Sequence, residues 1–346
     1  MIHIMNIVVI RWLAALGALI TLTTYLFFSF SAPEKPANST RSETTINLKD
    51  ISAQLIQPIP EPTLSSRELN IAKLGMQIFL DPNLSSNNRV SCESCHHIFD
   101  NGAENRQVSL GVQGLGARNS PTVFNVSHNS RFFWDGRASS LETQMDGPVH
   151  NPLEMNTNWQ KITRYVASVP TYKQQFNAQL NGTINESTIK ESLISFMTAL
   201  DTPDSPFDLF LKGNETAISQ AAINGWQQFK ILGCIACHQG TNIGGNLFQK
   251  FGNLNATDKK ESDLGRYNVT GLESDMGVFR VPSLRNVANT APYFHDGRAE
   301  TLEAAIVTMA YVQLGRELEP ATILELKAFL NALSAPPPPV LKELIP

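Results

Sequence analysis

Two motifs of the same kind constrain this chain more than any other feature. They are Cys92-Glu93-Ser94-Cys95-His96 and Cys234-Ile235-Ala236-Cys237-His238. Each places two thiols within one short helical turn and a histidine directly after them, which is the attachment signature of a c-type haem. The thiols add to the haem vinyl groups and the histidine becomes the proximal ligand of the iron. A zinc site or a redox thiol pair is the alternative. Because the two copies use all 4 cysteines of the chain, we predict two covalently bound haems.

The composition is that of a globular protein with about two domains. The chain has 346 residues, and one domain usually takes about 100–200. Hydrophobic residues make up 42% and charged residues 17% of the chain, which is enough apolar material for real cores. The net charge is −4 and there is no long basic run, so nucleic acid is not an expected partner.

The N-terminal part predicts export from the cytoplasm. Residues 12–32 form an uncharged, largely apolar stretch that follows Arg11. This stretch is long enough to span a bilayer and longer than the usual core of a signal peptide. An inner-membrane anchor, residues 1–32, is therefore favoured over a cleaved signal peptide. Either one predicts a periplasmic protein, which agrees with bacterial c-type haem attachment. The proline-containing residues 33–62 predict a linker, and residues 336–346 predict a proline-rich tail.

The sequences around the two haem motifs match one another. A five-residue segment that begins with glycine and ends with phenylalanine precedes each motif. A segment that contains Asp-Gly-Arg-Ala follows each motif, and a segment that begins with phenylalanine and ends with leucine closes each half. Three matched blocks in the same order indicate duplication of one domain, because the unit is far longer than that of a solenoid array. The matched pairs are residues 75–79 and 225–229, 134–142 and 295–303, and 196–200 and 329–333.

The apolar pattern predicts a mainly α fold. Leu69, Ala72, Met76 and Phe79 share one face of a helix, and similar spacing recurs near the end of each half. No sustained alternation of apolar and polar residues marks a sheet. We predict two tandem c-type cytochrome domains, each wrapped around one covalent haem and preceded by an N-terminal hydrophobic helix. The two domains are residues 63–214 and 215–335.

The two halves differ at the place where a second iron ligand would come. An iron bound by protein on both sides transfers electrons, whereas an iron with one open side can bind a substrate. Met309 lies seven residues after Leu302, and the matching residue after Leu141 is Pro148, which has no ligating atom. A methionine in a helix usually fills a core, but in this register we expect Met309 to bind the second iron. The repeat thus predicts one closed and one open haem.

Two polar residues flank Pro148 in the sequence. Gln144 lies four residues before it and Glu154 six residues after it. A carboxylate beside an open haem can move a proton between the two oxygens of peroxide, and a neutral amide can hold the peroxide by hydrogen bonds. A solvated surface charge would be the ordinary role of Glu154. Its place beside the missing ligand favours a catalytic role instead.

Over about residues 65–335 the chain resembles the bacterial dihaem cytochrome c peroxidase family. The resemblance implies that His96 binds the peroxidatic haem and that His238 and Met309 bind the haem that receives electrons. Gln144 and Glu154 match the catalytic pair of the family. Besides the haem motifs, the resemblance rests on residues 118–125, 133–137, 147–155 and 281–286.

The resemblance also implies roles at the boundary between the halves. Trp134 matches a tryptophan that relays electrons between the two haems. Asn119, with the backbone carbonyls of Thr290 and Pro292, matches an interdomain calcium site, and ligands that are all oxygens suit calcium. These three residues would otherwise be read as an ordinary turn.

One position departs from the pattern of the family. Many members carry a histidine sixteen residues after the proximal one, which blocks the peroxidatic iron until the other haem is reduced. That position here is Val112, which cannot bind iron. We therefore predict that the first haem is open at rest and needs no reductive activation. Of the remaining histidines, His150 lies two residues after Pro148, and whether it or water occupies the distal side of this haem at rest stays open.

The preferred function is reduction of hydrogen peroxide to water. A small cytochrome c or copper protein would deliver electrons to the second haem, and they would be used at the first. One alternative is an enzyme that oxidises a protein side chain through high-valent haem, as the methylamine-utilisation dihaem enzymes do. Those place a tyrosine on the second haem, and Tyr311 lies two residues from Met309. The other alternative is a non-catalytic, membrane-tethered dihaem electron carrier. The electron donor, the haem potentials, cleavage of the N-terminal segment and the oligomeric state, a homodimer included, stay open.

Overall fold

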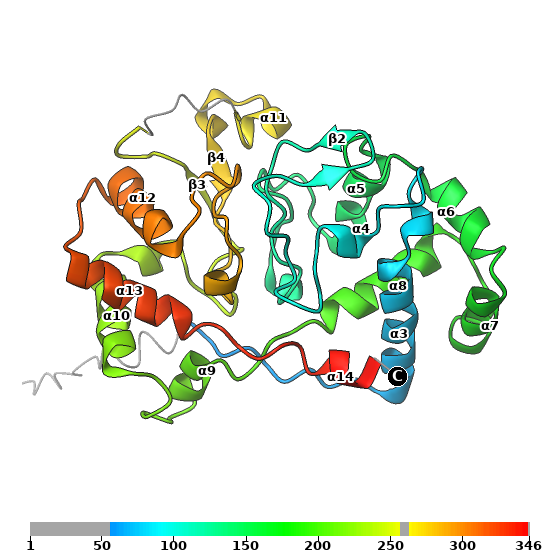
Figure 1. Ribbon diagram of the computed structural model, residues 1–346, viewed down its shortest axis with the longest axis horizontal. Helices are drawn as coiled ribbons and strands as arrows, with labels where there is room; N and C mark the ends of the chain where they lie inside the picture. The colour runs from blue at the N-terminus through cyan, green and yellow to red at the C-terminus, as the bar shows by residue number, and fades with distance from the viewer. Residues whose placement is uncertain (1–55, 257–262, 345–346) are drawn as a thin grey trace, which may run out of the picture. The chain divides into compact units, whose positions relative to one another are not determined.

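A computed structural model of the protein describes residues 56–256 and 263–344. The described residues belong to one compact unit, and they are mainly helical, as predicted. Residues 1–55, including the predicted hydrophobic helix, lie outside the described part of the chain. Among the described helices, none combines the length and the apolar character that crossing a bilayer requires. Figure 1 shows the elements of the two halves in two groups.

The first half contains six helices and one small hairpin within its described residues. The helices are α3 (Ser66–Leu80), α4 (Leu141–Gln144), α5 (Asp146–His150), α6 (Trp159–Val166), α7 (Pro170–Gln179) and α8 (Glu186–Thr198), and the antiparallel strands are β1 (Leu110–Gly111) and β2 (Gly114–Leu115).

The second half contains five helices and one small sheet within its described residues, and a last helix follows. The helices are α9 (Pro206–Leu211), α10 (Gln220–Ile231), α11 (Tyr267–Thr270), α12 (Leu302–Leu314), α13 (Pro320–Asn331) and, last, α14 (Val340–Leu344), and the antiparallel strands are β3 (Phe248–Lys250) and β4 (Val278–Arg280).

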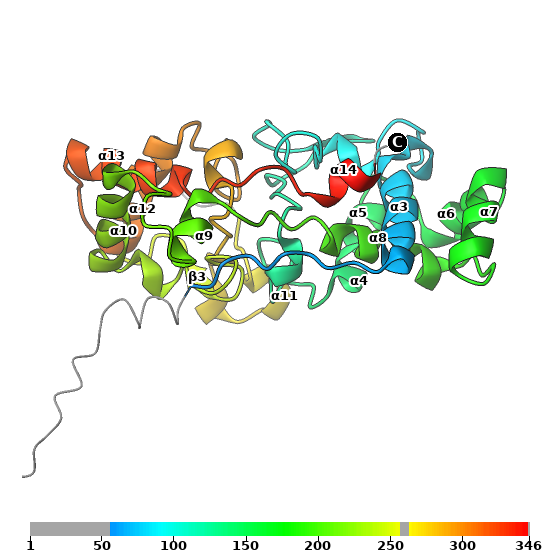
Figure 2. The same ribbon diagram turned by 90° about the horizontal axis from the view of Figure 1, so that it is seen from below.

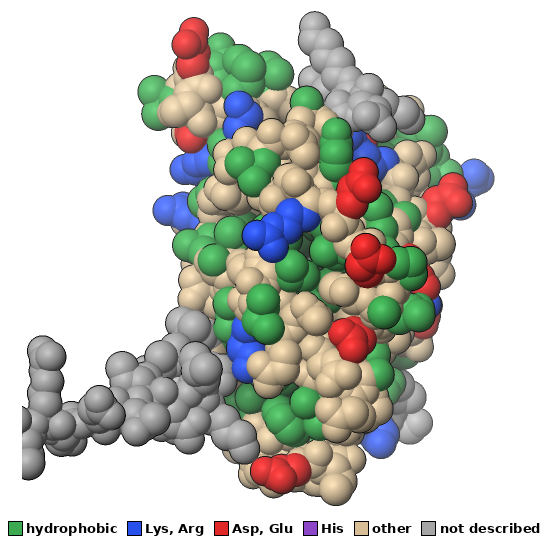
Figure 3. Space-filling view, turned by 90° about the vertical axis from the view of Figure 1, so that its left-hand side faces the viewer, with side chains coloured by type: hydrophobic (Ala, Val, Ile, Leu, Met, Phe, Trp, Pro, Cys, Tyr) green, Lys and Arg blue, Asp and Glu red, His purple; other side chains and the backbone are tan. Residues whose placement is uncertain are grey.

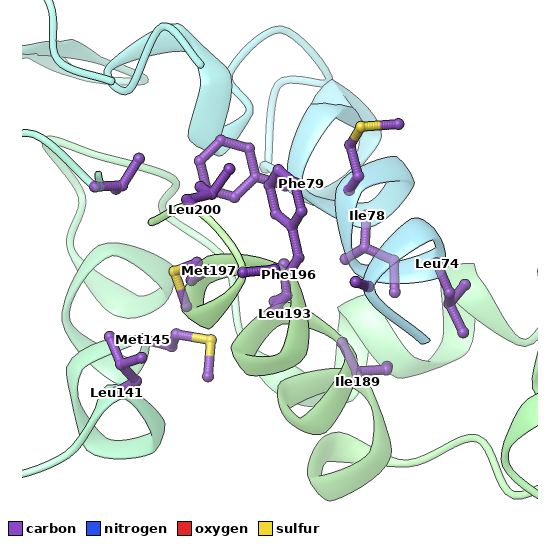
Figure 4. Close-up of a cluster of buried hydrophobic side chains, with 14 of the residues drawn as sticks. Leu74, Ile78, Phe79, Leu141, Met145, Ile189, Leu193, Phe196, Met197 and Leu200 are labelled. Atoms are coloured by element: carbon purple, nitrogen blue, oxygen red, sulfur yellow. The ribbon is translucent and has the colours of Figure 1, made fainter. Parts of the chain in front are cut away.

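The framework of the first half is the crossing of α3 with α8. A capping box between Ser65 and Glu68 starts α3 and satisfies its first backbone N–H groups. A Cβ atom added to Gly75 would lie 1.9 Å from the carbonyl oxygen of Ser192, so only glycine lets the two helices approach so closely. Next to this point the rings of Phe79 and Phe196 meet edge to face at 5.3 Å. Figure 4 shows both rings within the surrounding apolar cluster.

The second half repeats this crossing with α10 and α13. A Cβ atom on Gly225 would lie 1.9 Å from the carbonyl oxygen of Glu325, and the rings of Phe229 and Phe329 lie 5.1 Å apart. Gly225 matches Gly75 in the sequence repeat, and Glu325 matches Ser192. The repeated blocks are therefore the same helix crossing built twice.

Each half has its own hydrophobic core, but the ends of the described chain are exchanged between them. Ile56 belongs to the core of the second half, although the first half follows it in the sequence. Val340, Leu341 and Leu344 of α14 belong to the core of the first half. We call residues 56–64 the N-terminal strap and residues 335–344 the C-terminal strap. Figures 1 and 2 both show the straps running between the halves.

The straps lie in segments that the sequence predicts to be a linker and a tail. Ile59, in the predicted linker, is completely buried, and the backbone oxygen of Gln57 accepts a hydrogen bond of 2.8 Å from the buried Arg285. In the predicted tail, α14 follows the prolines and packs against α3. Both segments are thus structural parts of the folded unit.

Matching residues of the two repeats meet each other where the halves touch. Asn125 and Asn286 both adopt left-handed backbone conformations, with φ of 57° and 58°. Their side-chain amides donate to the same hydroxyl oxygen, that of Thr202, at 2.7 and 2.9 Å. The rings of Trp134 and His295, which also match in the repeat, lie edge to face at 6.2 Å. The halves therefore join through equivalent positions.

The surface mixes charges of both signs. On the side of α12 and α13, Figure 3 shows basic and acidic side chains interspersed among apolar and polar ones. This agrees with the small net charge of −4.

Candidate active site

The haem motifs lie at the walls of two cavities. Cys92, Cys95 and His96 line a cavity of about 650 Å³ in the first half. The second motif lines a cavity of about 310 Å³. Both motifs begin with a single 3₁₀ turn, Cys92–Ser94 and Cys234–Ala236. This turn brings two thiols and one imidazole to the same wall, as the spacing predicts.

The donor groups of both cavities fit a covalently held haem. The Nδ1 atoms of His96 and His238 are buried without a hydrogen-bond partner. Removal of water from around each imidazole lowers its pKa to about 4, so both rings are neutral, which is the form that binds a metal. Burial also raises the pKa of Cys92 and of Cys95 to about 12. Both thiols are therefore protonated at neutral pH.

Three residues that were predicted to lie beside the open side of the first haem come together in the first cavity. Gln144, Pro148 and Glu154 all line it together with His96. Ser140 caps α4 by accepting a hydrogen bond from the backbone of Thr143, and α5 follows directly, so both short helices present residues to one space. His150, in contrast, is exposed at the end of α5 and does not line this cavity.

Glu154 is held in a half-buried position. Its Oε1 accepts a hydrogen bond of 2.7 Å from the side-chain amide of Asn151. Burial raises the pKa of Glu154, and the Asn151 bond and the charge of Arg137 only partly oppose this rise. A raised pKa makes the carboxylate a stronger base, which suits the proton-accepting role predicted for Glu154.

The hairpin β1–β2 fixes the backbone beside Glu154. The backbone N–H of Val112 donates to the carbonyl oxygen of Glu154 at 2.8 Å, and that of Gln113 donates to Pro152 at 3.2 Å. A Cβ atom on Gly111 would lie 1.9 Å from the carbonyl oxygen of Leu153. The backbone of the hairpin is therefore in direct contact with residues 152–154, the loop that carries Glu154. This contact could not be predicted from the sequence, because backbone atoms make it.

The second cavity contains the predicted methionine. Thr301 caps α12 by accepting from the backbone of Ala304, and the helix presents Met309 to the cavity that His238 also lines. Tyr311 points elsewhere: its side chain is 42% exposed and does not line the cavity. The position in the helix thus favours Met309 over Tyr311 as a second ligand.

Trp134 connects the two cavities because it lines both. It is buried, and its indole N–H donates to the backbone oxygen of Asn119 at 2.9 Å. Asn119, Thr290 and Pro292, the predicted calcium ligands, all line the second cavity. The side-chain amide of Asn119 donates to the backbone oxygen of Arg106 at 3.0 Å, which holds the asparagine in place.

A charged cluster closes the first cavity toward the second half. Arg118 donates to Asp135 at 2.6 Å and, in two bonds, to Asp263 at 2.6 and 2.9 Å. Burial alone would raise the pKa of Asp263, but the bonds from Arg118 hold it below its usual range. Asp135 also accepts from Arg137 at 2.8 Å. The carboxylates in this cluster are therefore already neutralised by arginines.

Comparison with known proteins identifies the class of enzyme. The family described as di-haem cytochrome c peroxidase matches residues 70–216. The chain is 40% identical over 285 residues to the cytochrome c551 peroxidase of Nitrosomonas europaea, covering 82% of this chain and 85% of that protein. It is 37% identical over 332 residues to the cytochrome c551 peroxidase of Pseudomonas aeruginosa, covering 93% and 94%. The chain belongs to the dihaem cytochrome c peroxidase family, as its motifs predict, and is therefore an oxidoreductase of a two-haem, peroxide-using class.

The family also includes relatives with other names. The methylamine utilization protein MauG of Methylorubrum extorquens is 30% identical over 300 residues, covering 85% of this chain and 83% of that protein. A solved MauG-like protein associated with microbial copper homeostasis superposes with a TM-score of 0.69 at 26% identity, covering 80% of this chain and 93% of that one. The family that the chain belongs to therefore includes proteins named for processes other than peroxide reduction.

Proposed function

We propose that the protein reduces hydrogen peroxide to water with electrons from a small cytochrome c or copper protein. The observation that carries this proposal is the difference between the two cavities. The second is lined by two iron-ligand candidates, His238 and Met309. The first is lined by His96 together with Glu154 and Gln144. The two haems would supply the electron transfer and the iron at which peroxide is reduced.

The residues of the first cavity would handle the protons. Overall, one peroxide, two electrons and two protons give two waters. Because Asn151 occupies Oε1 of Glu154, we assign the proton transfer to Oε2, which takes a proton from one peroxide oxygen and delivers it to the other. Gln144 would hold the peroxide in place by hydrogen bonds. Proton transfer of this kind contributes roughly 10²–10⁴ in rate.

The remaining residues would supply electrons and hold the halves together. Electrons would enter at the Met309 side and pass by Trp134, which lines both cavities. Asn119 with the carbonyls of Thr290 and Pro292 would hold calcium between the haem domains 63–214 and 215–335. Because bacteria attach c-type haems outside the cytoplasmic membrane, the protein would act in the periplasm, and residues 1–32 would be its anchor or export signal.

We also propose that the first haem is open at rest. Val112 carries no ligating atom, its side chain does not line the first cavity, and neither does that of His150. The as-purified diferric protein should then show a high-spin haem signal in its electron paramagnetic resonance spectrum. A spectrum with low-spin signals only would contradict an open site.

Steady-state peroxide consumption with a reduced cytochrome as donor tests the main proposal. The expected result is peroxide-dependent oxidation of the cytochrome, two equivalents for each peroxide. An electron carrier would give none. An enzyme that oxidises a protein side chain would consume peroxide with little oxidation of the cytochrome, and the exposure of Tyr311 speaks against it.

A further inference from the structure

Arg280 is a buried arginine at the junction of the two cavities. It is the last residue of β4 and only 4% exposed. Its side chain is among the few that line both cavities. Its backbone N–H donates to the carbonyl oxygen of Trp134 at 2.7 Å, so it is fixed beside the residue that connects the cavities.

The charge of Arg280 has no carboxylate partner among the described residues. Its Nε donates to the backbone oxygen of Phe133 at 3.2 Å, and one terminal nitrogen reaches the amide oxygen of Asn129 at 3.5 Å. Both acceptors are neutral. Arg285, the other fully buried arginine of this region, pairs with Asp208 at 2.6 Å.

An unpaired buried cation is expensive for a folded protein. Burial lowers the pKa of Arg280 to about 10, which still leaves the guanidinium charged at neutral pH. A guanidinium carries five N–H donors, and only two of its nitrogens bond to the protein. The remaining donors lie at the cavity walls, so the missing anion has to come from what the cavities hold.

We propose that Arg280 binds the carboxylate side chains of the haems where the two cavities meet, and that its charge favours reduction of the haem it contacts. The planar guanidinium matches a carboxylate in two parallel hydrogen bonds. A positive charge near an iron centre stabilises the reduced form, because reduction adds negative charge. This inference rests on the two-haem part of the proposed function and does not depend on peroxide turnover.

The first test is the reduction potential of the haems in Arg280→Gln. The haem content of the purified protein is measured first, and absence of haem in the wild type would refute the proposed function itself. In a spectroelectrochemical titration we expect at least one haem of the variant to be about tenfold harder to reduce, which for one electron is about 59 mV. Unchanged potentials of both haems in a fully loaded variant would overturn the proposal.

The matched control is Arg298→Gln. Arg298 is also in the second half, but it pairs with Asp296 at 2.6 Å and lines neither cavity. We expect Arg298→Gln to shift the reduction potentials of the haems by only a small fraction of the shift caused by Arg280→Gln. Equal shifts in both variants would show a general effect of net charge and would also overturn the proposal.

A second variant decides the matter if Arg280→Gln does not fold or take up haem. Arg280→Lys keeps the charge but loses the two-pronged geometry. Resonance Raman bands of the haem carboxylate side chains should shift in this variant, because one of two parallel hydrogen bonds is lost. Bands identical to those of the wild type would mean that Arg280 does not contact a haem carboxylate.

Discussion

Among single residues, Glu154 has the surroundings that its chemistry needs. For Glu154→Gln we expect peroxide turnover to fall by about 10²–10⁴, because an amide cannot carry the proton. Both haems should stay attached, since the Cys92, Cys95 and His96 side chains that would hold the first haem are unchanged in this variant. Turnover and haem absorbance measured on the same sample check this. Glu142→Gln, an exposed change in the same segment, is the control, and equal losses in the two variants would contradict the assignment.

The pH dependence of turnover should follow the raised pKa of Glu154. In the proposed mechanism the carboxylate form of Glu154 is the active one, so we expect turnover to fall as the pH drops through this pKa. Since burial raises the pKa, the loss begins at a higher pH than for an ordinary glutamate. Asn151→Ala removes a hydrogen bond that lowers the pKa, so the acid limb of the pH profile should move to higher pH still. A limb that stays in place or moves to lower pH would rule out Glu154 as the titrating group.

At the scale of elements, the hairpin β1–β2 holds the backbone of the loop that carries Glu154. In Gly111→Ala the new Cβ atom would meet the carbonyl oxygen of Leu153 at 1.9 Å, and the Glu154 loop would have to move. A displacement of about 1 Å at a reacting group can cost about 10²-fold in rate. We expect a drop in kcat of up to this size, with haem content unchanged.

Gly116→Ala is the matched control for the hairpin. A Cβ atom there meets no atom closer than 3.5 Å, which is an ordinary contact. This variant should keep the turnover of the wild type. If Gly111→Ala kept it as well, the hairpin would not be a support for Glu154.

An element could be predicted from the sequence where its contacts depend on a local pattern of side chains. The crossings at Gly75 and Gly225 were predictable, because glycine, helical spacing and the repeat all coincide there. The meeting of Gln144 and Glu154 in one cavity followed from the register of the repeat around Pro148. The support from Gly111 was not predictable, because backbone contacts between distant segments leave no pattern in side chains.

For the whole molecule, the straps decide how the halves hold together. Leu341 of α14 is 5% exposed in the core of the first half. Leu341→Ala should lower the free energy of unfolding by about 2–5 kcal/mol. It should also lower the midpoint of thermal unfolding, measured through a signal from the first haem domain. Leu324→Ala, where the side chain is 63% exposed, should change the midpoint little. Similar shifts would mean that the C-terminal strap adds no stability.

At this scale, the packing of the straps could not be predicted from the sequence. The sequence predicts that the prolines of residues 336–339 begin a tail, but a further helix, α14, follows them and belongs to the core of the first half. The destination of these residues depends on long-range packing. The burial of Arg280 was hidden for the same reason. An arginine in a sequence is most simply read as a surface residue, and only the packing of both halves around it shows otherwise.

The pairing of equivalent residues across the two halves has an evolutionary consequence. Asn125 and Asn286 meet at Thr202, and Trp134 meets His295, which is how the identical subunits of a twofold dimer touch. This is the arrangement expected if the two halves descend from a symmetric pair of identical one-haem subunits. In such a pair every substitution appears on both sides, whereas in one chain the two copies can change independently. One copy can then carry Met309 where the other carries Pro148, which allows the two copies to take different roles.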